Sequence, residues 1–110
     1  MDVDIRAHMQ ADLMEAMKDR SASRVAVLRA TLGALANAEA VDAPSGPVSL
    51  TASAGRTEAA RRELSDDDVR AVIERERAEL LAAADERDTL GLPDDAADLR
   101  SKAEMLAAYL

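Results

Sequence analysis

Apolar residues recur every three to four positions in four stretches of the chain, which is the spacing of one face of an α-helix. The first two stretches predict helices over residues 4–19 and from about residue 22 to residue 40. The polar break KDRSAS between them is short, so the two helices should form an antiparallel pair. The first stripe consists of Ile5, Met9, Leu13, Ala16 and Met17, and the second of Val25, Leu28, Leu32, Leu35 and Ala36.

The third helix is predicted to begin at Ser65, whose hydroxyl can cap it while the carboxylate of Asp68 reaches back to form a capping box. It should end before Gly91, and Pro93 suits the first turn of a fourth helix. The inward positions are Val69, Val72, Ile73, Glu76, Leu80 and Ala83 on the third helix, and Ala96, Leu99, Ala103, Leu106 and Leu110 on the fourth.

The segment VDAPSGPVSLTASAG separates the second and third helices and holds two of the three prolines and two of the four glycines. A long segment of this composition predicts a mobile loop over about residues 42–56. The expected fold is therefore all-α: a small antiparallel bundle of four main helices with a long loop between helices 2 and 3. The length of 110 residues indicates one domain.

Composition restricts the core and the setting of the protein. With one Tyr and no Phe or Trp, the core must be built from aliphatic side chains, and the absence of Cys excludes disulfides and thiolate chemistry. No apolar run is long enough to span a membrane, and the first residues lack the features of a secretory signal. We therefore expect a cytoplasmic protein that does not enter a membrane.

The net charge of −8 is unevenly spread along the chain. Residues 1–64 carry nine acidic and eight basic side chains, a balance of −1, whereas residues 65–110 carry thirteen and six, a balance of −7. Because phosphate neutralisation dominates nucleic-acid affinity, any contact with nucleic acid is expected in the first half.

Candidate chemistry is sparse. His8 is the only histidine, and no orienting partner for a general base is visible beside it. The glycine in GALANAE lacks the lysine and spacing of a phosphate-binding loop, and no catalytic triad is implied. We predict no catalytic, cofactor-binding or metal-binding residues and no cofactor.

Two groups of charged residues stand out. Glu76 falls on the inward stripe of the third helix, where a buried carboxylate needs a partner, and Arg29 is the candidate. That pair would either fix the packing of the helices or face a ligand. The second group lies around the first interhelical turn, where it can contact nucleic acid or form a rim for an acidic protein partner. Its members are Lys18, Arg20, Arg24 and Arg29.

Several segments together resemble one known family. MQADLMEAMKDRSASRVAVLRATLGALANAE, RRELSDDDV and AEMLAAYL, in this order, are similar to the first helical domain of the YqeY-like proteins. That family is grouped with the tail of the B subunit of the glutamyl/aspartyl-tRNA amidotransferase. The resemblance implies a helical bundle followed by a second, amidotransferase-tail-like domain, and we expect that second domain to be absent because the sequence stops at Leu110.

The leading functional expectation is a non-catalytic helical interaction or accessory domain that works through a protein partner, in association with tRNA-dependent amidation. The alternatives are a tRNA-binding module that uses the basic turn, and a component of a glutamine-dependent carbon–nitrogen ligase, which the resemblance alone suggests. The oligomeric state is left open. At the end of the chain, Leu106 and Leu110 are expected to dock into the bundle, with Tyr109 against the first or second helix.

Overall fold

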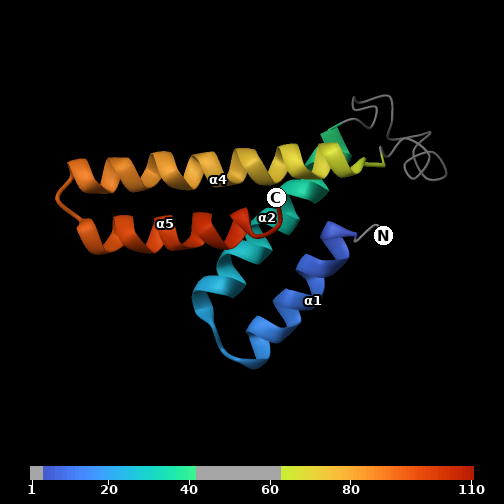
Figure 1. The fold of residues 1–110 in the computed structure, drawn as a ribbon, viewed down its shortest axis with the longest axis horizontal. Helices are drawn as coiled ribbons and strands as arrows, with labels where there is room; N and C mark the ends of the chain where they lie inside the picture. The colour runs from blue at the N-terminus through green and yellow to red at the C-terminus, as the bar shows by residue number, and fades with distance from the viewer. Residues whose placement is uncertain (1–3, 42–62) are drawn as a thin grey trace, which may run out of the picture.

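The computed structural model describes residues 4–41 and 63–110, which form four helices and no strand (Figure 1). The helices are α1 (Ile5–Lys18), α2 (Ala22–Val41), α4 (Asp66–Thr89) and α5 (Pro93–Ala107). The all-α fold with four main helices is therefore confirmed. The loop predicted over about 42–56 lies outside the described residues.

Local signals in the sequence define where the helices begin and end. The Asp4 carboxylate accepts hydrogen bonds from the backbone N–H groups of Arg6 and Ala7 and caps α1. The capping box of α4 forms as predicted, because Ser65 Oγ accepts from Asp68 N and Asp68 Oδ2 accepts from Ser65 N, each at 3.1 Å. Three acidic residues in the first turn also stabilise α4, because their negative charges lie at the positive end of the helix dipole.

A tight turn connects α4 to α5. Gly91 has φ of 75°, a left-handed conformation that glycine adopts without steric cost. Pro93 then occupies the first turn of α5, where the missing N–H of proline leaves no helical hydrogen bond unmade. The turn therefore folds α5 back along α4 as an antiparallel hairpin (Figure 1).

The four helices are arranged as two hairpins. α1 and α2 form the shorter one, which crosses the α4–α5 hairpin near the C-terminal end of α5, so the part of α4 and α5 around Gly91 extends beyond α1 and α2 (Figure 1). One fully buried side chain from each helix meets at the crossing. These are Met9, Leu35, Ile73 and Leu106, all 0% exposed and part of one apolar cluster.

Small residues line the contact within the α4–α5 hairpin. Ala84, Ala96 and Ala103 are each 0–1% exposed. Because alanine ends at Cβ, two helices that face each other with alanines can approach closely and still leave no void. This part of the hairpin therefore depends on small side chains, unlike the crossing.

The predicted stripes are correct for most positions and wrong at three. Met17 is 49% exposed, Leu110 is 43% exposed, and Ala36 is exposed on the outer side of α2. α1 and α2 each pack on one side only, so the buried stripe is narrower than the periodic pattern. α5 ends at Ala107, so helical spacing no longer places Leu110 on the inward face.

Candidate functional site

The structure separates the four basic residues that the sequence grouped around the first turn. Arg24, in the first turn of α2, is partly buried, and its Nη1 lies 3.7 Å from Asp19 Oδ2. It also lines a small pocket with Met105 and Tyr109 from the end of the chain. Arg24 therefore belongs to the contact between α2 and the C-terminal segment.

Lys18, Arg20 and Arg29 remain exposed and form no ion pair with any described residue. Lys18 is the last residue of α1, and Arg20 lies in the turn with φ of 56°. The Arg29 guanidinium donates a hydrogen bond to a sulfur, with Nη2 3.9 Å from Met17 Sδ. These three cations are therefore available to an anionic partner.

Two methionines of α1 extend this surface. Met14 is 65% exposed and Met17 is 49% exposed, and they lie one turn apart on the side of α1 that also bears Lys18. Methionine is flexible and polarisable, and it is over-represented on surfaces that bind other proteins. We call the surface made by Met14, Met17, Lys18, Arg20 and Arg29 the basic corner.

The outer face of α2 continues the basic corner as an apolar floor. Within residues 22–40 of this helix, every exposed residue is small or polar, and Arg29 is the only charged one among them. The exposed apolar positions are Ala22, Ala26, Ala30, Gly33, Ala36 and Ala40. A surface helix normally presents charged residues to water, so this face is unusual in a chain with 33% charged residues.

The predicted pair between Glu76 and Arg29 does not form. Arg29 lies on the outer face of α2 beside Met17, whereas Glu76 is only partly buried on α4. Desolvation, followed by the charge of Glu79, raises the pKa of the Glu76 carboxyl, and Arg75 is the basic residue that opposes this rise. Because Glu76 is only partly buried, its carboxylate does not require a buried cation.

An unpredicted cluster joins the end of the chain to α1. The Tyr109 hydroxyl donates a hydrogen bond to Asp12 Oδ2, and His8 Nε2 lies 3.5 Å from the same oxygen. The rings of His8 and Tyr109 meet edge to face, with centroids 5.5 Å apart. Tyr109 was expected against the first or the second helix, and the structure places it against the first. The helical spacing of His8 and Asp12 was visible in the sequence, but their shared partner is 97 positions away from Asp12.

This contact affects the ionisation of the tyrosine. Desolvation, followed by the hydrogen bond and charge of Asp12, raises the pKa of Tyr109 well above its usual value, and Arg24 lowers it slightly. The cluster therefore favours the neutral phenol. It locks the C-terminal segment to α1, which is a structural role.

We expect the single tyrosine to report this contact directly. In the folded chain, tyrosinate absorbance should appear well above the pH of about 10 at which an unfolded tyrosine ionises. Because the folded pKa is the raised one, stability from the contact is intact below about pH 10 and is lost as the pH rises further. Asp12→Asn should move the titration towards the ordinary value, whereas Glu15→Gln, an exposed control on α1, should not. A native midpoint near 10 would contradict the contact.

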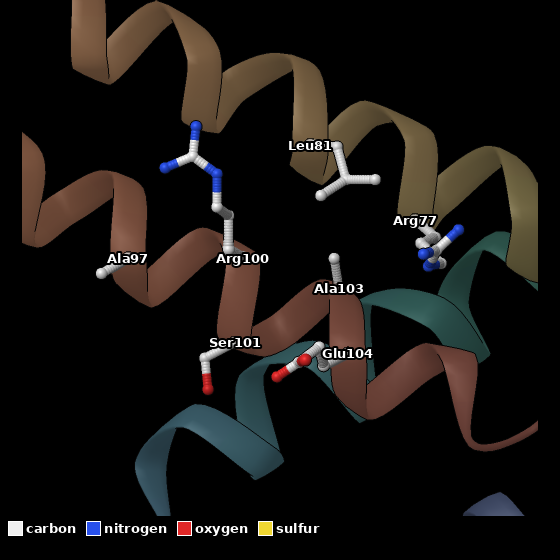
Figure 2. Close-up of a pocket in the computed structure, with 7 residues that line it drawn as sticks. All are labelled: Arg77, Leu81, Ala97, Arg100, Ser101, Ala103 and Glu104. Atoms are coloured by element: carbon white, nitrogen blue, oxygen red, sulfur yellow. The ribbon is translucent and has the colours of Figure 1, made fainter.

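An open pocket lies along the α4–α5 hairpin (Figure 2). The Arg77 Nε atom there is buried and has no hydrogen-bond partner among the described residues. Arg100 Nη2 donates hydrogen bonds to Asp85 Oδ1 at 3.0 Å and to Asp88 Oδ2 at 2.6 Å. The lining mixes cations, a carboxylate and alanines: Arg77, Leu81, Ala97, Arg100, Ser101, Ala103 and Glu104. These side chains do not converge on one point in Figure 2, so the pocket has no recognisable binding geometry.

The far end of the same hairpin exposes two leucines that sequence analysis did not single out. Leu90 is 65% and Leu92 is 43% exposed, on either side of Gly91. Asp94 and Asp95 follow in the first turn of α5, and neither forms an ion pair with any described residue. The sequence TLGLPDD could have indicated these exposed leucines, because they flank the glycine of the turn. We call Leu90, Leu92, Asp94 and Asp95 the hairpin tip.

The described residues show neither a metal-binding cluster nor a membrane-spanning helix. Within residues 4–41 and 63–110, no group of three or more metal-ligating side chains is placed to hold an ion, and no helix is long and apolar enough to cross a membrane. Comparison of the chain with protein-family models, with curated proteins and with solved structures finds no match. The exposed surfaces themselves are therefore the basis for a functional argument.

Proposed function

We propose that this chain is a non-catalytic helical interaction domain that binds an acidic segment of a protein partner at the basic corner. The observation that carries the proposal is the exposure of Met14 and Met17 beside three cations that have no ion-pair partner among the described residues. Apolar surface rimmed by charge is typical of a protein-binding site. The resemblance to the first helical domain of the YqeY-like proteins supports the same proposal, with an accessory role in tRNA-dependent amidation.

The surface suits a protein better than a nucleic acid. Single-stranded nucleic acid is bound by stacking its bases on aromatic side chains, and the only aromatic ring besides the histidine is Tyr109, which is held against α1. Methionines and alanines instead provide an adaptable apolar floor for aliphatic or aromatic side chains of a partner. The surrounding cations would then select an acidic segment.

The test is a capture experiment from an extract of the source cell with three immobilised proteins. These are the wild type, the corner variant Lys18→Glu with Arg29→Glu, and a control that reverses two exposed cations of α4, Arg70→Glu with Arg75→Glu. The control changes the net charge by the same amount. A protein that the wild type and the control both retain should be captured in at least tenfold smaller amount by the corner variant. Equal retention by all three would contradict the proposal.

A tRNA-binding module is the second candidate, because the same exposed cations of the basic corner can contact phosphates. The net charge of −8 opposes this, since affinity for a polyanion depends on phosphate neutralisation. We expect no specific complex with tRNA at about 150 mM salt, where the Debye length is roughly 8 Å. A micromolar complex that persists there and is lost in the corner variant would favour the tRNA reading over a protein partner.

A further inference from the structure

The exposed large apolar side chains gather at two separate places. Of the five in the described residues, Met14 and Met17 lie at the basic corner and Leu90 and Leu92 lie at the hairpin tip, while Leu110 lies alone at the C-terminus. Exposed apolar residues scattered singly need no explanation, but two pairs do. The two pairs also carry opposite charge.

The hairpin tip is acidic where the basic corner is positive. Residues 85–98 contain six acidic side chains and one basic one, a balance of −5. Arg100 pairs with Asp85 and Asp88, and Lys102 Nζ lies 3.1 Å from Asp98 Oδ2, so those acids are partly compensated. Asp94 and Asp95, next to Leu92, are not. The tip therefore offers two leucines and two carboxylates, and the corner offers two methionines and three cations, and none of these charged groups forms an ion pair with another described residue.

The tip cannot reach the corner of its own chain. α4 and α5 run side by side up to Gly91, and this end of the hairpin points away from α1 and α2 (Figure 1). The salt bridges and hydrogen bonds along the hairpin, such as that between Arg100 and Asp88 at 2.6 Å, oppose bending it back. Any contact between the two complementary surfaces must therefore join different molecules.

We infer that the basic corner binds the hairpin tip of a second copy of this chain, with the two leucines against the methionines and the apolar floor of α2. The inference rests on the proposed function, because it names the partner of the same surface. The contact is heterologous, since one surface of a molecule meets a different surface of the next, so association can continue into rings or chains.

The contact should be weak and dependent on salt. Two short apolar pairs cover less surface than the roughly 1,200–2,000 Å² of a standard stable interface, so binding in the micromolar range or weaker is expected. The opposite charges around the apolar centre guide the two surfaces together and are screened as salt is added. A weak, reversible contact of this kind would let a tighter acidic partner displace the second copy.

The first measurement is sedimentation velocity of the full chain from micromolar to millimolar concentration at low salt. The sedimentation coefficient of the wild type should rise with concentration, and less so at high salt. The corner variant Lys18→Glu with Arg29→Glu, and the tip variant Leu90→Ser with Leu92→Ser, should each stay monomeric. All four positions are exposed or lie at the turn, so circular dichroism should show folded helices in both variants.

Mixing the two variants is the decisive step. The tip variant retains an intact corner and the corner variant retains an intact tip, so an equimolar mixture should form a one-to-one dimer and no larger species. With methyl-labelled methionine in the tip variant, addition of the unlabelled corner variant should shift the signals of Met14 and Met17. The buried Met9 should not respond. Its signal is the internal control.

A further variant on the corner side, Gly33→Glu, guards against the possibility that Lys18→Glu and Arg29→Glu abolish association by disturbing the fold. A Cβ at Gly33 would contact nothing within 4 Å, and glutamate favours a helix more than glycine, so Gly33→Glu should keep the monomer intact. Gly33 lies on the apolar floor of α2, so Gly33→Glu should also abolish association, whereas Gly33→Ala should not.

A wild type that stays monomeric at millimolar concentration would overturn the inference. Association that survives in the corner variant, the tip variant or Gly33→Glu would also overturn it, as would an equimolar mixture of the corner and tip variants that fails to dimerise. The proposed function is tested separately, by the corner-dependent capture of another protein: loss of self-association alone would overturn only the inference, whereas equal capture by all three immobilised proteins would contradict the proposed function.

Discussion

Leu106→Ala should lower the free energy of unfolding by about 2–5 kcal/mol, the range for removing a fully buried leucine side chain. Leu106 is 0% exposed and is the contribution of α5 to the crossing of the two hairpins, where Met9, Leu35 and Ile73 meet it. A loss of this size is a large share of the roughly 5–15 kcal/mol that stabilises a typical domain.

Deletion of residues 106–110 should have a still larger effect, because it also removes Tyr109 and its hydrogen bond to Asp12. We expect a molten chain or a sharply lower midpoint in urea unfolding followed by circular dichroism. Leu110→Ala is the matched control: Leu110 is 43% exposed, so the midpoint should change little. An unchanged midpoint after the deletion would show that the end of the chain does not belong to the core.

Ala96→Leu should destabilise the domain by about 1–3 kcal/mol, as overpacking of a well-filled contact does. Ala96 is 0% exposed where α4 and α5 face each other, with Ala84 and Ala103 in the same contact. A larger side chain must push the helices apart or take an unfavourable rotamer.

The neighbouring residue supplies the control for this prediction. Ala97 is exposed, so Ala97→Leu should leave the unfolding midpoint nearly unchanged although it adds the same side chain one position further along. Equal effects of the two substitutions would mean that α5 is rotated relative to the contact described here. Measuring both midpoints in urea under identical conditions decides the matter.

The helices themselves were predictable because their signals are local. Ser65 and Asp68 form the predicted capping box, and Pro93 starts α5 as expected. Each of these features involves residues within a few positions of one another, so sequence spacing alone specifies the geometry. The stripes identified Met9, Leu35, Ile73 and Leu106 for the same reason, since helical periodicity is a property of each segment by itself.

The surfaces that carry the functional proposals were less predictable. The grouping of Arg24 with Lys18 and Arg29 followed from their proximity in sequence, but α5 returns to cover Arg24 and leaves the other two exposed. Met17 satisfied the periodic pattern and still lies in solvent, because no second helix packs on that side of α1. Periodicity shows which residues share a face, whereas exposure depends on which faces the other helices cover.

The sequence by itself determined that the chain is helical, where each described helix starts, where the first three of them end, and which side chains have the spacing of a core. Only the tertiary structure decided that Tyr109 meets Asp12 and His8, that Glu76 and Arg29 stay apart, and that Leu90 and Leu92 lie exposed at a projecting turn. The physical reason is the range of the interactions involved. Capping and periodicity act within one helix, whereas these contacts depend on the angle at which two hairpins cross, and that angle is set by the packing of many side chains at once.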